Sequence, residues 1–357
     1  MKAKVYLSDE GFGHIVRQRA ILEELVKLES ALQVTIQTEG HYDFAVDNLP
    51  NHNAIRRFNN IRWHKKEDSS PDLQSIQEYY QNYSDISSNY LKEERDEADF
   101  DFTISDFVYE AFQLAEEKKR PSFGVAHFTW DWFFSKLYPR VISDPLFKYF
   151  TERANSAAAL FFPPLTPSDN LAFYKKNAVS VPFIVRSNVD HRSWPSDGRF
   201  RILIMDSGAG LMKQSIRKAL SNISSKEFII GVTESGADSD VDVFRIPKDQ
   251  LLVDYVKHSD LVVGRPGFNT LSECIAYRVP MLLLSESMNP EMDHNISELK
   301  KLRLGAFISK YDFENRLESF LSDFLKNEYQ NLERSMNSHE FETNGAETVA
   351  KQILERL

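Results

Sequence analysis

The sequence predicts an α/β protein made of two Rossmann-like domains, each with a doubly wound parallel sheet, facing one another across a cleft. Short aliphatic and β-branched runs alternate with helical stretches almost throughout, which is typical of parallel sheets. The 357 residues are enough for two domains that each bury a core. A polar segment with a proline and a glycine, residues 187–199, is the best linker candidate, so the domains would be 1–186 and 200–343.

In the first domain, one long helix and a series of strands account for the apolar pattern. The helix at 14–28 places Ile15, Leu22 and Leu25 on one face, as packing against a sheet requires. The polar stretch at 71–98 is expected to be a helix that flanks a mobile segment. The expected strands are 4–7, 34–37, 55–58, 102–105, 123–126, 160–162 and 181–184.

The alternation begins again in the second domain. The run Leu261-Val262-Val263 is too short and too β-branched for a helix. Residues 281–284 are apolar at every position, which fits a parallel strand covered on both faces. The tail, 344–357, is an amphipathic helix whose apolar stripe must pack somewhere. The expected strands are 201–205, 228–232, 242–246, 261–263, 281–284 and 306–308.

Composition excludes several classes of protein. A net charge of −10 argues against a nucleic-acid binder, which would show a basic patch. No stretch approaches the roughly 18 apolar residues of a membrane span, and the first 14 residues lack the apolar core of a signal peptide. The single cysteine, Cys274, excludes an intrachain disulfide and fits a reducing compartment. We expect a cytoplasmic protein, with a peripheral position at the inner membrane face as the alternative.

A glycine-rich turn with a histidine follows the first expected strand. Gly11 and Gly13 allow a ligand to approach the backbone closely, and His14 and Arg17 follow at the start of the helix, with Arg17 as a candidate contact for an acceptor. The positive end of a helix disfavours a protonated imidazole, so His14 would suit a general base near neutral pH. A capped turn with a surface histidine is the alternative interpretation.

The second domain has a turn at the equivalent position. Ser207 and Gly208 follow the strand at 201–205 and precede a helix. Small residues and backbone N–H groups in such a turn can cradle a diphosphate. An ordinary strand-to-helix turn is the alternative.

The segment 259–295 carries the most candidates for ligand binding. Its strand and glycine turn lead into a helix N-terminus, where α/β proteins hold phosphate. Gly267 and Asn269 would donate N–H groups to that phosphate, and Thr270 is a further candidate for nucleotide-sugar binding. Glu273 would accept hydrogen bonds from ribose hydroxyls, or else Thr270 and Glu273 form a capping box.

Polar residues also follow the next strand of this segment. Asp293, His294 and Asn295 come after the strand at 281–284. They would hold sugar hydroxyls, or simply cap a helix at 296–302.

Two strands of the first domain end in further candidates. Asp106 follows the strand at 102–105 and would act as a base or orient an acceptor. His127, Trp130 and Asp131 follow the strand at 123–126, and their mixture of aromatic and acidic groups suits an acceptor surface. Core packing explains these aromatic residues equally well.

Two acidic patterns are dismissed as metal sites. Asp99-Phe100-Asp101 precedes a strand, whereas the D-x-D motif of metal-dependent sugar transferases follows one. The run at 238–242 begins like a calcium loop, but Val243 stands where that loop has glycine, and no glutamate follows at position twelve. We therefore expect neither a metal nor a cofactor.

Taken together, these segments resemble the GT-B sugar-nucleotide transferases. The Gly11–His14 turn with Arg17, the Gly264–Glu273 segment and Asp293–Asn295 resemble the branch that contains the bacterial lipid-linked GlcNAc transferase and the UDP-sugar hydrolase of nonulosonic acid synthesis. Residues 105–106, 128–131, 181–182 and 261–273 resemble the glycosyltransferase-like N-terminal region of plant and bacterial L-arabinokinase.

The resemblance implies a GT-B fold and a metal-independent, inverting transfer from a nucleotide-diphosphate donor, expected to be UDP-linked, to an unknown glycan, lipid or small-molecule acceptor. It also implies that the tail helix packs back on the first domain. His14 would lie near the reacting carbon. The phosphates and ribose would contact Gly267, Asn269 and Glu273, and the donor sugar would contact Asp293 and Asn295. The turn at 206–208 departs from the fuller Gly-Gly-Ser run of this family.

Two other functions stay open on the same fold. A nucleotide-sugar hydrolase or epimerase would not need the acceptor, and release of free sugar without acceptor would identify a hydrolase. A binding protein that has lost its chemistry is the other alternative, which the reduced turn at 206–208 makes plausible.

Overall fold

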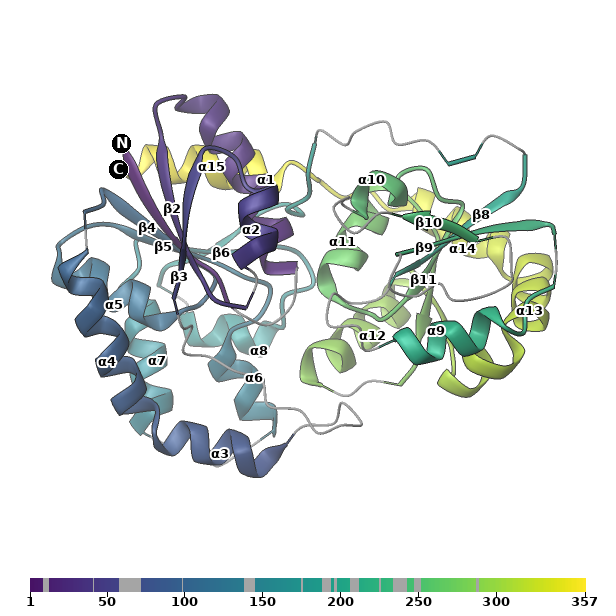
Figure 1. The fold of residues 1–357 in the computed structure, drawn as a ribbon, viewed down its shortest axis with the longest axis horizontal. Helices are drawn as coiled ribbons and strands as arrows, with labels where there is room; N and C mark the ends of the chain where they lie inside the picture. The colour runs from purple at the N-terminus through teal and green to yellow at the C-terminus, as the bar shows by residue number, and fades with distance from the viewer. Residues whose placement is uncertain are drawn as a thin grey trace. The chain divides into compact units, whose positions relative to one another are not determined.

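The computed structural model divides into two compact units, and each is described by itself. Unit 1 comprises residues 1–186 and 343–357, and unit 2 comprises residues 187–342 (Figure 1). The described residues are 1–8, 13–40, 42–57, 72–97, 99–137, 145–174, 176–187, 194–195, 198–205, 212–224, 226–233, 243–246, 252–286 and 289–357.

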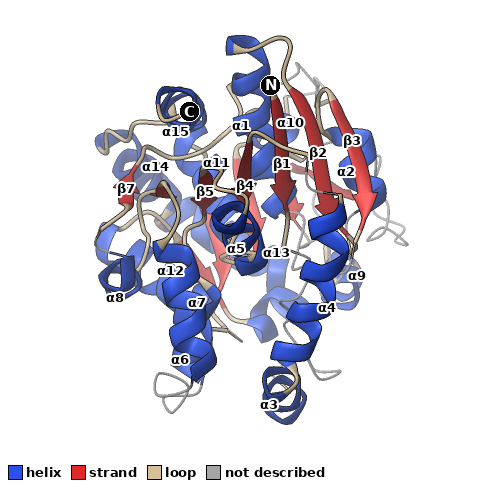
Figure 2. Ribbon diagram, turned by 90° about the vertical axis from the view of Figure 1, so that its left-hand side faces the viewer, coloured by secondary structure: helices blue, strands red, loops and turns tan. Residues whose placement is uncertain are grey.

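Unit 1 is built on a seven-stranded parallel sheet with the order β3-β2-β1-β4-β5-β6-β7 (Figure 2). The strand order reverses at β1, which pairs with both β2 and β4, and ligands of α/β proteins bind beside such a reversal. The strands are β1 (Lys2–Tyr6), β2 (Gln33–Thr38), β3 (His52–Arg56), β4 (Phe102–Ser105), β5 (Ser122–Val125), β6 (Ala159–Phe162) and β7 (Ala178–Ser180).

Two helices cover one face of this sheet, α1 (Gly13–Leu28) and α15 (Gly345–Glu355). Ile21 of α1 and Val349 of α15 are fully buried in one apolar cluster with Val5 and Ile36 of the central strands. The remaining helices are α2 (Tyr42–Asn48), α3 (Leu73–Gln81), α4 (Tyr83–Asp96), α5 (Tyr109–Glu117), α6 (Trp130–Leu137), α7 (Pro145–Asn155) and α8 (Ser168–Leu171), with a 3₁₀ turn at Ala172–Tyr174.

A second core of unit 1, formed largely by helices α5, α6 and α7, is aromatic. Tyr109 stacks on Phe150 with ring centroids 4.2 Å apart, and Trp130 stacks on Phe134 at 5.7 Å. All four rings are buried, and such pairs add to the free energy that apolar burial supplies.

The tail helix is fastened to unit 1 by its backbone. Asn344 forms an antiparallel bridge with Ile184, and the Gly345 N–H donates to the Phe183 carbonyl at 3.1 Å. A Cβ on Gly345 would lie 2.1 Å from the Pro182 carbonyl oxygen, so no larger residue fits this approach. The strand expected at 181–184 is wrong, because this segment pairs with the tail through a single bridge and β7 lies just before it.

Unit 2 is built on a six-stranded parallel sheet with the order β10-β9-β8-β11-β12-β13. The order reverses at β8, and β11 and β12 are buried at every position, which explains their uninterrupted apolar sequences. The strands are β8 (Phe200–Met205), β9 (Phe228–Thr233), β10 (Val243–Ile246), β11 (Leu261–Gly264), β12 (Met281–Leu284) and β13 (Ala306–Ile308).

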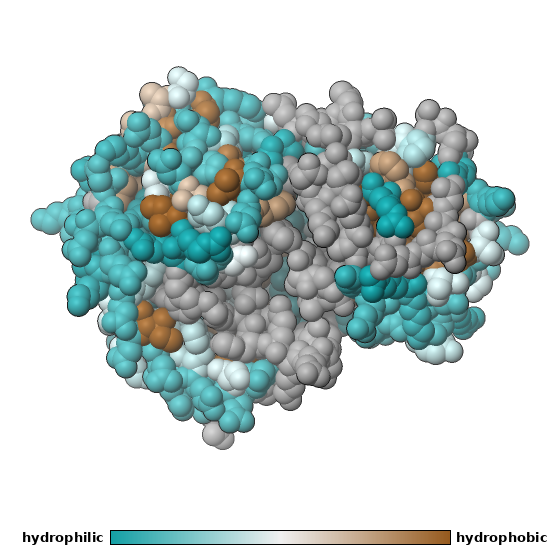
Figure 3. All heavy atoms as spheres, in the orientation of Figure 1, coloured by the Kyte–Doolittle hydropathy of each residue, from teal (hydrophilic) through white to brown (hydrophobic). Residues whose placement is uncertain are grey.

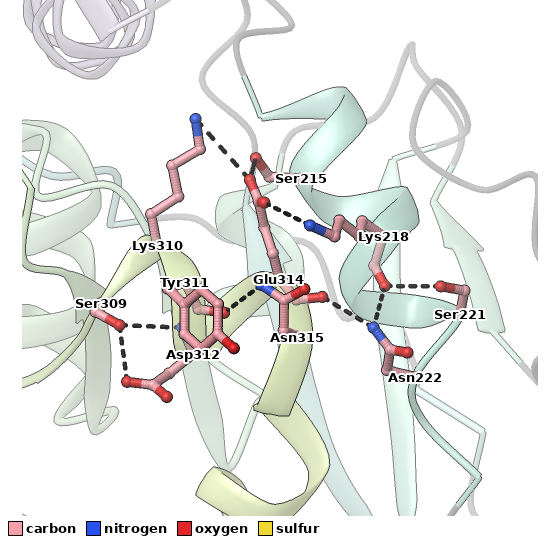
Figure 4. Close-up of polar contacts among 10 residues, drawn as sticks. All are labelled: Ser215, Lys218, Ser221, Asn222, Ser309, Lys310, Tyr311, Asp312, Glu314 and Asn315. Atoms are coloured by element: carbon pink, nitrogen blue, oxygen red, sulfur yellow. Dashed lines mark hydrogen bonds and ion pairs between the residues drawn. The ribbon is translucent and has the colours of Figure 1, made fainter.

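Polar contacts attach one helix of unit 2 to another (Figure 4). Glu314 accepts a hydrogen bond from the Ser215 hydroxyl at 2.6 Å and pairs with Lys218 at 3.3 Å. Its carbonyl also accepts from the Asn222 amide at 2.9 Å, so α13 docks on α9. The helices are α9 (Lys213–Leu220), α10 (Val253–Val256), α11 (Phe268–Tyr277), α12 (Pro290–Leu302), α13 (Lys310–Asn327) and α14 (Tyr329–Ser338).

Part of the segment expected as a linker belongs to unit 2. Trp194 is buried, and its indole N–H donates to the Tyr255 carbonyl at 3.2 Å. The ring lies on β9 at Gly231, where a Cβ would be 2.5 Å from it. The chain therefore joins unit 2 before residue 199.

The described surface in the view of Figure 3 is mainly hydrophilic, with hydrophobic residues in small separate areas. Tyr311 is the most exposed large hydrophobic side chain among the described residues, at 66%. Within the same residues, no helix combines the length and apolar character needed to cross a bilayer.

Candidate functional site

Three polar side chains meet at the carboxyl end of β1 and β4. His14 and Arg17 lie in the first turns of α1, and Asp106 follows β4 directly. His14 Nδ1 is 2.6 Å from Asp106 Oδ2, and Arg17 Nη2 donates to Asp106 Oδ1 at 2.6 Å. Arg17 and Asp106 are buried, whereas 13% of the His14 side chain is exposed. Residues distant in sequence thus form one cluster beside the strand reversal, with an imidazole at its exposed end.

The backbone turn after β4 directs Asp106 to this cluster. Phe107 has a φ of 51°, a left-handed conformation that costs a non-glycine residue roughly 1–2 kcal/mol. The Ser105 hydroxyl accepts the Val108 N–H at 2.9 Å and closes the turn. As a result, Asp106 contacts α1 while the Phe107 ring enters the aromatic core.

Asp106 is held as a carboxylate. Burial disfavours its charge, but the nearby Arg17 and His14 outweigh burial and hold the pKa of Asp106 below its usual value. An ionised carboxylate only accepts hydrogen bonds, so the short contact requires a proton on His14 Nδ1. In a neutral imidazole, Nε2 then carries the lone pair, which is the form that a general base needs.

His127 extends the cluster to the end of β5. Its Nδ1 lies 3.4 Å from Arg17 Nη1, and its ring meets the edge of Phe128 at a centroid distance of 4.8 Å. His127 is buried, with 6% of its surface exposed. The structure therefore brings together His14, Arg17, Asp106 and His127, and Arg17 contacts the other three. Arg17 is too buried to form part of an acceptor surface.

Trp130 and Asp131 belong to the aromatic core, so packing explains them better than an acceptor surface does. Trp130 is 3% exposed and Asp131 is fully buried. The Asp131 carboxylate accepts from the Tyr109 hydroxyl at 3.1 Å and from the Tyr174 hydroxyl. Burial raises the pKa of Asp131, although these hydrogen bonds oppose the rise.

In unit 2, the N-terminus of α11 follows β11 after a short turn. The helix begins at Phe268 with Gly267 as its N-cap, so Thr270 lies inside the helix and the expected capping box is wrong. The Phe268 N–H donates instead to Glu291 Oε1 at 3.1 Å. A Cβ at Gly267 would meet no atom of the described residues within 4 Å, so packing among these residues does not demand glycine there. Asn269 occupies the first turn of the same helix.

The helix after β12 starts earlier than expected. α12 begins at Pro290, and Asn289 is its N-cap, with Oδ1 accepting the Met292 N–H at 2.9 Å. Asp293 and Asn295 are therefore not caps. Asn295 is fully buried, and its amide donates to the Pro266 carbonyl at 2.9 Å. Asn295 therefore supports the turn before α11, while Asp293 lies in the first turn of α12.

Glu273 lies in the middle of α11 and is 6% exposed. Its neighbour Cys274 is buried, and burial together with the Glu273 charge raises the pKa of the Cys274 thiol. This cysteine is therefore a packed thiol rather than a reactive one.

Glu291 is a site residue that was not predicted from the sequence. Its carboxylate sits at the N-terminus of α11, the position expected for a phosphate. Asn289-Pro290 was the available signal, because asparagine followed by proline marks a helix start and would have placed Glu291 in its first turn.

Some predicted residues lie outside the described residues. These are Gly11 in the first turn and Ser207 and Gly208 in the second, together with the acidic run at 238–242. Gly13 is described and is the first residue of α1.

Asp99 and Asp101, which precede β4, both bind Lys2 near the N-terminus. Asp99 pairs with the Lys2 side chain, and Asp101 accepts the Lys2 backbone N–H at 2.8 Å. In the part of the chain that is described, three or more metal-binding side chains of His, Cys, Asp or Glu do not come together.

Comparison by sequence gives one match. Residues 226–353 match the family described as the glycosyltransferase family 28 C-terminal domain. No curated protein matches the chain.

Comparison by structure identifies the fold over the whole chain. The glycotransferase of kitacinnamycin has a TM-score of 0.67 at 13% identity, covering 100% of this chain and 98% of that one. The spinosyn rhamnosyltransferase SpnG, complexed with thymidine diphosphate, has a TM-score of 0.65 at 15% identity, covering 99% and 100%. The glycosyltransferase SnogD from Streptomyces nogalater has 0.63 at 16%, covering 100% of both. The two parallel-sheet units therefore have the GT-B fold.

Proposed function

We propose that this protein is a glycosyltransferase that moves a sugar from a nucleotide-diphosphate donor, UDP-linked in our proposal, to a hydroxyl of an acceptor. The observation that carries the proposal is the His14–Asp106 pair at the strand reversal of unit 1. Such a pair is suited to removing a proton from a hydroxyl. The GT-B fold and the family 28 match of residues 226–353 support the choice of reaction.

The proposed reaction is a direct displacement that inverts the sugar's anomeric carbon and needs no metal. The acceptor oxygen attacks that carbon, and the bond from the carbon to the phosphate oxygen breaks. The nucleoside diphosphate leaves with the electron pair, and the hydroxyl proton passes to His14 Nε2. Asp106 holds Nδ1 and stabilises the imidazolium that forms.

The donor's diphosphate is assigned to the N-terminus of α11. Backbone N–H groups at Gly267, Phe268 and Asn269 would stabilise the charge that develops on the leaving group. No atom of the described residues lies within 4 Å of a Cβ built at Gly267, which supports a close approach of phosphate to the backbone there. The Glu291 carboxylate accepts the Phe268 N–H, so a phosphate would have to replace this carboxylate.

The finer assignments also belong to this proposal. Glu273 would bind ribose, and Asp293 the donor sugar. The turn at Gly13 and His14 with Arg17 supports a place near the GlcNAc transferase branch, and residues 105–106, 128–131, 181–182 and 261–273 support one near L-arabinokinase. The single buried Cys274 supports a cytoplasmic location.

A thermal-shift screen with nucleotides and nucleotide sugars tests the proposal. Structural relatives include a rhamnosyltransferase bound to thymidine diphosphate and a UDP-glucosyltransferase, so the screen should include both nucleotides. A ligand at about 100 times its Kd stabilises the folded state by about 2.7 kcal/mol, which is readily visible. Donors that raise the Tm are then incubated with mixed glycan, lipid and small-molecule acceptors. Nucleoside diphosphate release that depends on an acceptor would support transfer, whereas the same release into water would identify a hydrolase.

A further inference from the structure

We propose that Arg17 is a positioning residue that keeps His14 in the Nδ1–H tautomer by holding the Asp106 carboxylate in place. The inference rests on the proposed function, since it assigns Arg17 a role in the same reaction. Arg17 was expected to contact an acceptor, but the guanidinium is turned inward and only 2% of the residue is exposed.

Three contacts place the guanidinium at the centre of the cluster. Nη2 donates to Asp106 Oδ1 at 2.6 Å, Nη2 approaches His14 Nδ1 at 3.3 Å, and Nη1 lies 3.4 Å from His127 Nδ1. His14 Nδ1–H donates a hydrogen bond to Asp106. Because Nδ1 carries this hydrogen, it cannot accept from Arg17 Nη2 at 3.3 Å, and the guanidinium lies beside the ring as a cation without a hydrogen bond to it. The arginine thus occupies one carboxylate oxygen of Asp106 and leaves the other to His14.

Stability alone does not explain an arginine at this position. Only 2% of Arg17 is exposed, so the guanidinium lies in a poorly solvated region. Arg17 Nε is also buried and has no hydrogen-bond partner within the described residues. Burying a charge costs several kcal/mol before pairing, and an apolar residue of similar volume often serves stability as well. The directional contacts to Asp106 and His14 account for the arginine better.

The tautomer of His14 depends on the charge of Asp106. A buried carboxylate that loses its cation binds a proton more readily. A protonated Asp106 could then donate to His14 Nδ1 and move the imidazole proton to Nε2, where it would block proton acceptance. Among the described residues, the charged or titratable groups hydrogen-bonded to Asp106 are His14 and Arg17, and Arg17 reaches His127 in turn. Arg17 therefore acts on His14 through Asp106.

The direct test measures the tautomer and not the activity. We compare the wild type with Arg17→Met and Arg17→Lys by nitrogen-15 NMR of the histidine rings, with His14→Gln to assign the signal. The matched control is Arg19→Met, on the same helix but paired with Glu23 at 2.8 Å. We expect the Nδ1–H form of His14 in the wild type and in Arg19→Met. Arg17→Met should shift the population clearly toward the Nε2–H form. Arg17→Lys should give an intermediate population, because lysine keeps the charge but not the planar guanidinium. An unchanged tautomer in Arg17→Met would overturn the proposal.

The second test is kinetic and separates a positioning role from a structural one. We expect Arg17→Met to lower kcat/KM for the acceptor roughly 10-fold to 100-fold, less than removal of a general base would, with donor affinity unchanged. The loss should largely disappear in an Asp106→Asn background, because a residue that acts through Asp106 cannot act without its carboxylate. Equal losses in both backgrounds would overturn the proposal. If Arg17→Met does not fold, Arg17→Lys carries both tests. If no transfer activity is found, the proposed function fails, but the NMR result still decides the role of Arg17.

Discussion

The two strand reversals of this protein carry different kinds of chemistry. Beside β1 in unit 1, side chains dominate: His14, Arg17 and Asp106 form charged contacts in a largely buried cluster. In unit 2, near β8, the start of α11 presents backbone N–H groups, and one of these is held by Glu291. The difference suggests that unit 1 supplies proton transfer and unit 2 supplies recognition of an anion. Changes in unit 1 should therefore lower the turnover rate, and changes in unit 2 should alter nucleotide affinity.

Among the variants that test this division of roles between the units, His14→Ala should have the largest effect. Losing a general base typically costs roughly 10²-fold to 10⁴-fold in rate, and we expect a fall of this size in kcat. Nucleotide affinity, measured by calorimetry, should stay within about twofold because His14 is not part of the α11 N-terminus. A His14→Ala protein that turns over normally would refute the assignment of the base.

Asp106→Asn should give the next largest effect. The amide keeps the shape but not the charge, so we expect kcat to fall roughly 10²-fold. The pKa of Asp106 is below its usual value, so its carboxylate adds stability above pH 4 and loses that contribution as the pH falls through the folded-state pKa. The difference in unfolding free energy between wild type and Asp106→Asn should therefore shrink between pH 7 and pH 3. A difference that stays constant with pH would contradict the charged state assigned to Asp106.

Most strands of both units, and two residues of the unit 1 cluster, could be predicted from the sequence. β12 and β13 are continuous apolar runs, as buried parallel strands often are, and their expected positions agree with the structure to the residue. The position of β4 also agrees to the residue, and most other strands agree within two residues. The strand at 181–184 was wrong because the bridge to the tail joins residues far apart in the chain. Turn chemistry likewise identified His14 and Asp106 as candidates, since both follow strands at the carboxyl edge.

The contacts that define the two sites were less accessible, because they are tertiary. Arg17 was placed on a helix, but its pairing with Asp106 spans 89 positions in the chain. The pattern of Thr270 and Glu273 is a valid local capping signal, yet the N-cap of α11 is Gly267, and the Phe268 N–H donates to Glu291 on another helix. Spacing predicts which residues share a face of one element, but it does not reveal which element packs against them.

In unit 2, Glu273→Gln tests whether recognition extends beyond the backbone. If Glu273 accepts hydrogen bonds from ribose, the neutral amide should weaken UDP binding roughly 10-fold to 100-fold, the usual range for a hydrogen bond to a charged group. The kcat should change little, in contrast to the unit 1 variants. Calorimetry with UDP and with uracil alone would locate the loss, since only UDP contains the ribose. Unchanged UDP affinity in a folded Glu273→Gln protein would leave Glu273 as a structural residue of α11.

The smallest expected effect, and the sharpest test of unit 2, comes from Glu291→Gln. The Glu291 carboxylate accepts the Phe268 N–H at 3.1 Å, so it occupies the place where a phosphate would bind. A charge at a helix N-terminus contributes about 0.3–1 kcal/mol, so its removal should tighten UDP binding roughly twofold to fivefold. The matched control is Glu298→Gln on the same helix, where the carboxylate pairs with Lys301 at 2.6 Å. The gain should diminish at high salt, because ions screen the repulsion between carboxylate and phosphate. Weaker UDP binding in Glu291→Gln than in Glu298→Gln would mean that Glu291 supports the nucleotide directly and does not compete with it.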